Sequence, residues 1–201
     1  MYKIKRGKRA VRQPVCDSLT FASAFSKLER INQKIKTAYQ TDEKKISDPE
    51  EKKAWKKGIM RLQKKYNAAM QGLLDIREKP ALPITYDYAS EERVATAKEG
   101  EGKFITMSPN EFFQYAPEIS DGRYIFNEYS LKNIMDSVKR TGRIKVGYLT
   151  VEDGKVVGHE GRHNMAVARM LGVTDVPVYI RGKDFEDFQK EKIEPQYSKC
   201  Q

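Results

Sequence analysis

The spacing of apolar residues predicts two helices in the first third of the chain. One set recurs every three or four residues: Phe21, Phe25, Leu28, Ile31, Ile35 and Ala38. A second set has the same spacing: Trp55, Ile59, Leu62, Tyr66, Ala69 and Leu73. Asp48 and Pro49 supply an N-cap and a first helical residue for the second helix. The polar stretch 41–47 joins the two helices, so we expect an antiparallel hairpin over residues 18–78 with its apolar stripes facing each other.

The second half of the chain alternates short apolar runs with turn residues. We expect strands at residues 104–107, 144–151, from 155 onward and at 176–180, and helices from Ser108 and over 162–171. Ser108 and Glu111 have the spacing of a capping box, and Gly172 would end the last helix. This order predicts an α/β (α+β) domain over residues 103–182.

Three further segments complete the expected organisation. Pro80 and Pro83 break helices and predict a connector at residues 79–102. Residues 1–17 form a basic N-terminal arm, and residues 183–201 form a polar tail. No apolar run approaches the roughly 20 residues that span a bilayer, so we expect no membrane partner. Cys16 and Cys200 lie near opposite ends, which favours two free thiols over a disulfide.

The positive charge of the protein is concentrated in its N-terminal part. The formal net charge is +10, and residues 1–80 carry all of this excess. The arm contains the following cations and no acid before Asp17: Lys3, Lys5, Arg6, Lys8, Arg9 and Arg12. Such a segment can release counterions along a phosphate backbone without reading its sequence. We therefore expect non-specific nucleic-acid contact, with a solubilising tail as the alternative.

Both histidines of the chain lie in one stretch, His159-Glu160-Gly161-Arg162-His163, between a predicted strand and a predicted helix. The pattern H-E-x-x-H binds zinc when its two histidines share one face of a helix. Here the third position is a glycine, which costs about 1 kcal/mol relative to alanine inside a helix. The chain has no third histidine to complete the ligand set. Zinc hydrolysis is therefore the third-ranked interpretation, and zinc is not an expected cofactor.

A strand–glycine–helix junction that holds an anion explains the same residues better. Gly158 and Gly161 allow a sharp turn and a close approach of backbone to a ligand. The N–H groups at the start of the next helix, its dipole and the Arg162 guanidinium all favour a phosphate or carboxylate. The alternative is a structural turn whose polar residues only cap the helix.

The surrounding sequence resembles the core of the ParB/sulfiredoxin-like superfamily. The resemblance lies in the run from Val156 to Ala168, then Leu171-Gly172-Val173 and Val176-Pro177-Val178, and upstream in residues 130–144. It covers residues 103–182 and implies a small α/β domain with a mixed sheet, in which residues 130–141 form a helix that ends at Gly142. Members of this superfamily include CTP-dependent DNA-partitioning clamps, ATP-using sulfinic-acid reductases, small-molecule kinases and proteins described as nucleases. The resemblance implies that Gly161, Arg162 and His163 hold the phosphates of a nucleoside triphosphate, which would bind with magnesium.

Two departures from the family pattern change what is expected. Arg162 stands where sulfiredoxins carry their cysteine, so their redox chemistry is not expected. Asn164 stands where most relatives have a second arginine, and an amide donates hydrogen bonds without a charge. Whether the protein is an enzyme stays open.

The leading hypothesis is a nucleotide- or phosphate-binding protein associated with nucleic acid and encoded by a phage or plasmid. The phosphate-binding set would be Gly158, Gly161, Arg162, His163 and Asn164, and His159 or Glu160 would act as a base or metal contact. The alternative is a non-enzymatic component of a virion or another large nucleoprotein assembly that keeps the fold without catalysis. Either hypothesis places the protein in the cytoplasm of a host cell or in a virion.

Overall fold

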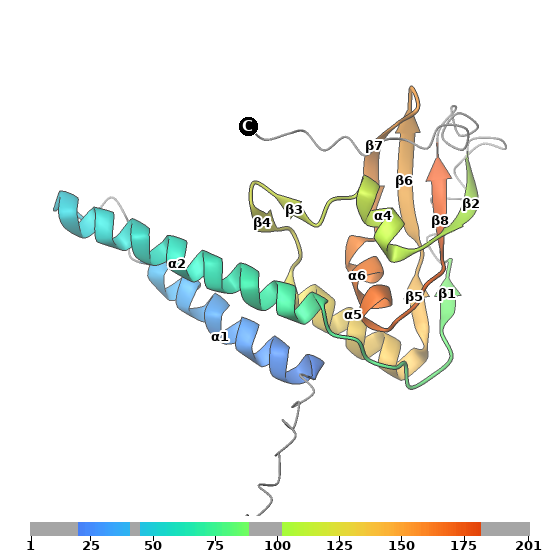
Figure 1. Ribbon diagram of the computed structural model, residues 1–201, viewed down its shortest axis with the longest axis horizontal. Coiled ribbons are helices and arrows are strands. Elements are labelled where there is room, and N and C mark those ends of the chain that lie inside the picture. The colour runs from blue at the N-terminus through green and yellow to red at the C-terminus, as the bar shows by residue number, and fades with distance from the viewer. Residues whose placement is uncertain (1–19, 41–44, 89–101, 182–201) are drawn as a thin grey trace, which may run out of the picture.

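The computed structural model describes residues 20–40, 45–88 and 102–181, which form a helical hairpin followed by an α/β domain with a mixed sheet (Figure 1). The predicted fold class is therefore confirmed. The predicted basic arm and polar tail lie outside the described residues.

The hairpin consists of α1 (Phe21–Gln40) and α2 (Pro49–Leu74), as the apolar spacing predicts. The Asp48 side chain accepts a hydrogen bond from the Glu50 N–H and caps α2. At the far end, Trp55 Nε1 donates to the Ala38 carbonyl at 3.1 Å, which ties the two helices together. Buried residues lie only in the parts near the domain: Phe21, Ala24, Phe25 and Leu28 of α1, and Tyr66, Ala69, Met70, Leu73 and Leu74 of α2. The other half projects beyond the domain (Figure 1).

The main sheet has four strands in the order β2 (Gly102–Met107), β8 (Val176–Arg181), β6 (Gly147–Glu152) and β7 (Lys155–Glu160). The β6–β8 pair is parallel and the other two pairs are antiparallel. Helices α4 (Pro109–Tyr115) and α6 (Arg162–Met170) cover one face. They approach so closely that a Cβ on Gly147 would lie 2.6 Å from Met165 Cε and 3.0 Å from Phe112.

The prediction of one strand over residues 144–151 is wrong, because the chain changes partners at Val146. Before this residue, β5 (Arg143–Lys145) pairs in parallel with β1 (Thr85–Asp87). After it, β6 joins the main sheet. β1 lies in the segment predicted as a connector. A short hairpin of β3 (Ile119–Ser120) and β4 (Arg123–Tyr124) was also not predicted; its turn has positive φ at Asp121 and Gly122.

The base of the hairpin and the α/β domain share one hydrophobic core. Leu28 and Leu73 belong to the same buried cluster as Leu131 of α5 (Glu128–Thr141) and Met165 of α6. The contact also contains a buried carboxylate, Glu128, which is 4% exposed.

Two carboxylates link the hairpin to α5. Glu128 accepts hydrogen bonds from Tyr66 Oη at 2.9 Å and from the Asn32 amide. Glu78, just after α2, accepts a hydrogen bond from the Phe21 N–H at 2.9 Å and forms an ion pair with Lys139 of α5 at 2.5 Å. The hairpin is therefore held to the domain by polar contacts as well as by apolar packing.

Candidate functional site

The strand–glycine–helix junction forms at the predicted residues. β7 ends at Glu160, Gly161 adopts φ +90°, and α6 begins at Arg162. A Cβ on Gly161 would lie 2.9 Å from Gly147 Cα, so the turn packs directly against the start of β6. No side chain caps the start of α6. Glycine is therefore required here both by its backbone conformation and by the close packing.

The two histidines do not share a helix face. His159 lies in β7, paired with Leu149, and His163 lies in the first turn of α6. His163 Nε2 accepts a hydrogen bond from the Asn127 N–H at 2.9 Å, and its ring packs edge-on against Phe126 at 5.5 Å. In the described part of the chain, no group of three or more His, Cys, Asp or Glu residues is placed to hold a metal. The geometry of a zinc-binding H-E-x-x-H helix is thus not formed.

Both histidines are neutral at pH 7. Burial, and then the positive charge of Arg162, lower the pKa of His159 and of His163 from the ordinary value of 6.5. A neutral His163 that accepts at Nε2 carries its proton on Nδ1. His159 Nδ1 is buried and has no hydrogen-bond partner among the described residues. Burial also lowers the pKa of Arg162, which is still fully charged at neutral pH.

The first residues of α6 point into different surroundings. The Arg162 guanidinium lies 3.5 Å from the Pro117 carbonyl, in the connection between α4 and β3. His163 contacts the start of α5, as described above. Asn164 lines a groove formed by α5, β5 and β1. Since each helical residue is rotated by about 100° from the one before it, the three side chains cannot converge.

The groove that contains Asn164 has a volume of about 350 Å³ and is called the α5 groove below. It is lined by Asp87, Ile134, Ser137, Val138, Thr141, Arg143, Lys145 and Asn164. Neither Arg143 nor Lys145 forms an ion pair with a residue that the structure describes. Thr141 Oγ1 accepts a hydrogen bond from the Arg143 N–H at 3.2 Å. Sequence reasoning missed Arg143; the signal available was a cation directly after Gly142, the left-handed residue that ends α5.

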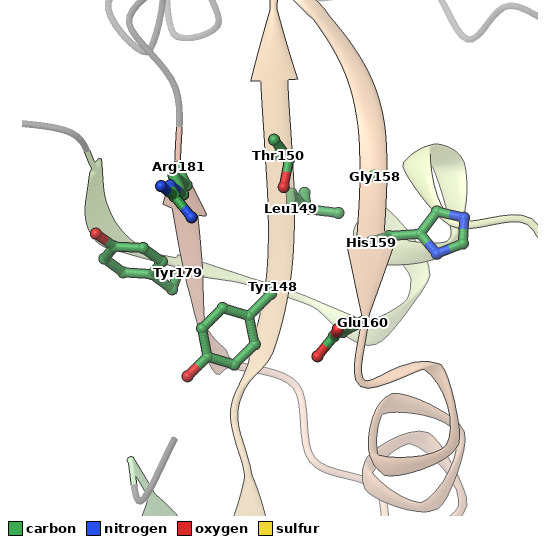
Figure 2. Close-up of a pocket in the computed structure, with 8 residues that line it drawn as sticks. All are labelled: Tyr148, Leu149, Thr150, Gly158, His159, Glu160, Tyr179 and Arg181. Carbon is green, nitrogen blue, oxygen red and sulfur yellow. The ribbon is translucent and has the colours of Figure 1, made fainter. Parts of the chain in front are cut away.

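A second hollow, of about 320 Å³, lies on the sheet face opposite the helices and is called the open-face pocket. It is lined by Tyr148, Leu149 and Thr150 of β6, by Gly158, His159 and Glu160 of β7, and by Tyr179 and Arg181 of β8. Figure 2 shows Glu160 on this side of β7 and the His159 ring on the other side. Neighbouring residues of a strand point to opposite faces, so the predicted pair of His159 and Glu160 is separated.

The predicted site residues therefore fall into several places. Gly158, His159 and Glu160 line the open-face pocket, although the His159 ring points away from Glu160 (Figure 2). Asn164 lines the α5 groove, and His163 accepts a hydrogen bond from the N–H of Asn127, the N-cap of α5. The predicted nucleic-acid contacts Lys3, Lys5, Arg6, Lys8, Arg9 and Arg12 lie outside the described residues.

Within the described helices, none combines the length and the apolar character needed to cross a bilayer. The chain matches no family model, no curated protein and no solved structure, so its resemblance to the ParB/sulfiredoxin-like superfamily stays a prediction.

Proposed function

We propose that this chain is a nucleotide- or phosphate-binding protein and that its anion site is the α5 groove. One observation carries the proposal: Arg143 and Lys145, two cations without an ion pair in the described residues, lie with Asn164 around a cavity of about 350 Å³. These two cations outnumber the one carboxylate of the groove, Asp87, so the cavity is net positive and favours an anion.

The other groups of the groove suit a phosphate. Arginine binds phosphate oxygens with two parallel hydrogen bonds, and lysine adds a point charge. Asn164 lies in the first turn of α6, where the helix dipole favours an anion. Asp87 supplies a carboxylate oxygen, the type of ligand that magnesium takes beside a phosphate. A nucleoside triphosphate with magnesium is the ligand class we propose.

The outward face of α2 supports an association with nucleic acid. Lys53, Lys57, Arg61 and Lys64 recur at three- and four-residue spacing and are all exposed. The last three surround the exposed Met60 in a shallow hollow of about 170 Å³. A row of cations along one helix face binds a phosphate backbone through counterion release, without reading its sequence. This contact would add to that of the basic arm.

A second candidate function, a non-enzymatic assembly component, is favoured by the shape of the hairpin. Its far half projects beyond the domain and leaves Tyr39 and Met60 50% and 61% exposed (Figure 1). A projecting helical pair with exposed apolar residues provides a surface for another subunit of an assembly. Native mass spectrometry tests this candidate, since a stable monomer at micromolar concentration would count against it.

The phosphate site is tested by a thermal-shift panel of CTP, ATP, GTP and their diphosphates, with and without magnesium. At a hundredfold excess over its dissociation constant, a ligand should stabilise the fold by about 2.7 kcal/mol. We expect this shift to disappear in a variant that combines Arg143→Ala and Lys145→Ala. Lys155→Ala is the matched control: it removes an exposed cation at the start of β7 and should keep the thermal shift.

Two results would contradict the proposal. A shift that survives in the groove variant and disappears in Arg162→Ala would place the phosphate at the Gly161 turn. No shift with any nucleotide, in protein that is folded by circular dichroism, would favour the assembly component.

A further inference from the structure

The open-face pocket belongs to an ordered pattern of side chains across the main sheet. The strand register places Phe104, Tyr179, Tyr148 and Glu160 side by side, one from each of the four strands. The next row on the same face lies two residues away on each strand, and it consists of Gly102, Arg181, Thr150 and Gly158. Neighbouring strands lie about 4.8 Å apart, so each row crosses about 14 Å of surface.

The first row is aromatic and its rings are in contact. The ring centroids of Phe104 and Tyr179 are 5.1 Å apart, and those of Tyr179 and Tyr148 are 5.8 Å apart. Tyr88 extends the row at 5.1 Å from Phe104. Tyr179 is buried at 5% exposure and supports its neighbours, whereas Phe104 and Tyr88 are 38% and 39% exposed. The face thus carries a row of aromatic rings in contact, of which Phe104 and Tyr88 are exposed.

The second row has little side-chain volume at its two ends, because both end residues, Gly102 and Gly158, are glycines. The Tyr179 ring leans over Gly102, where a Cβ would lie 2.8 Å from its phenol oxygen. Gly158 leaves room beside Thr150, and the pocket of about 320 Å³ lies here, with Arg181 on one side of β6 and Glu160 on the other (Figure 2). An aromatic wall, a cation and a carboxylate therefore surround one small hollow.

We propose that this face binds single-stranded nucleic acid, with one unpaired base in the open-face pocket. Tyr148 provides a ring for stacking, and Arg181 lies where the phosphate of the same nucleotide would pass. The Glu160 carboxylate accepts a hydrogen bond from an exocyclic amine, so cytosine or adenine is favoured over thymine or uracil. Phe104 and Tyr88 continue the surface for a neighbouring base.

The chemistry of the face argues for this occupant. A purely apolar partner would not match the charges of Glu160 and Arg181 at the pocket, and a duplex keeps its bases stacked inside. The aromatic surface extends beyond the pocket, which favours a strand over a single mononucleotide. No residue lines both this pocket and the α5 groove, so the site does not depend on the nucleotide site proposed above.

The test is fluorescence anisotropy with labelled eight-nucleotide strands of dC, dA and dT, and with a duplex of the same length. Gly158→Phe fills the pocket. Gly158 of β7 is paired with Thr150 of β6, and a Cβ added at Gly158 would meet only the Thr150 side chain, at 3.5 Å. Loss of base stacking should weaken binding of dC strands by about ten- to a hundredfold. Val157→Phe, the same substitution one residue earlier at an exposed position that does not line the pocket, is the matched control and should bind like the wild type.

A second variant keeps the test informative if Gly158→Phe does not fold. Glu160→Val should abolish the preference for dC and dA over dT while leaving the affinity for dT unchanged. Equal weakening by Gly158→Phe and Val157→Phe, a preference for the duplex, or the absence of any base preference in the wild type would each overturn the proposal. If free dCMP competes with the labelled strand as strongly as an unlabelled strand does, the pocket would be assigned to a mononucleotide instead.

Discussion

Replacement of Glu128 by alanine tests how the hairpin is held to the domain. The Glu128 carboxylate is buried at the start of α5 and accepts hydrogen bonds from Tyr66 and Asn32, which come from the two helices of the hairpin. Burial, and then the hydrogen bond and charge of Glu128, raise the pKa of Tyr66, so its hydroxyl stays a donor throughout the neutral range. One side chain thus joins three helices.

The expected loss follows from these contacts. A hydrogen bond to a charged group contributes about 1.5–3 kcal/mol, so the two bonds give about 3 kcal/mol at the lower figure. Tyr66→Phe removes one bond and should cost about 1.5 kcal/mol. Because total stabilities of domains are about 5–15 kcal/mol, the Glu128 variant should be visibly destabilised. Asp136→Ala, which removes an exposed carboxylate of the same helix, is the control and should change stability by less than about 0.5 kcal/mol.

Urea unfolding provides the assay, because the chain has one tryptophan, Trp55, in α2. Tryptophan fluorescence reports the hairpin and far-UV circular dichroism reports the whole fold. We expect coincident transitions and a coupling energy of about 0.5–3 kcal/mol between Glu128→Ala and Tyr66→Phe. Strictly additive losses would refute the contact. Separate transitions for the two probes would refute the single shared core.

Three further predictions concern the turn, the pH dependence and the basic face. Gly161→Ala should cost more than Gly154→Ala in thermal unfolding, since both have positive φ but only Gly161 lies against Gly147; equal losses would show that the contact contributes nothing. Burial would raise the pKa of Glu78, but its hydrogen bonds with α5 and α1 lower it overall, so its stabilisation should be present above pH 4.5 and lost as the pH falls through the lowered pKa. Denaturant titrations of wild type and Glu78→Gln should therefore converge in acid, and a constant difference would contradict this. Replacing Lys57 and Arg61 by alanine should reduce the salt dependence of duplex binding by about 0.9 per lost phosphate contact; an unchanged slope would remove α2 from the interface.

Local signals in the sequence predicted the helices well. The α2 cap at Asp48, the capping box of Ser108 and Glu111, and the start of α6 after Gly161 all depend on neighbours within a few residues. The broken strand at Val146 and the short strand β1 depend on which distant segment each residue pairs with. Periodicity carries no information about that choice, which is why these two features were missed.

The candidate sites were harder to predict for a geometric reason. Residues 158–164 cross from a strand into a helix, so a strand alternation of 180° is followed by helical steps of about 100°. Glu160 consequently lies in the open-face pocket and Asn164 in the α5 groove, although four positions separate them. The residues that line the groove with Asn164, such as Asp87 and Arg143, come from elements far away in the sequence.

The positions of the two histidines also limit which residues could catalyse hydrolysis of a nucleotide bound in the α5 groove. A general base must come within hydrogen-bonding reach of the proton it removes, directly or through one water. Neither histidine is among the residues that line the α5 groove, and His163 Nε2 already accepts a hydrogen bond from the backbone of Asn127. Of the groove residues, only Asp87 carries a carboxylate. If the bound nucleotide is hydrolysed there, Asp87→Asn should abolish turnover and reduce the magnesium-dependent part of the thermal shift, whereas His159→Ala should leave both unchanged.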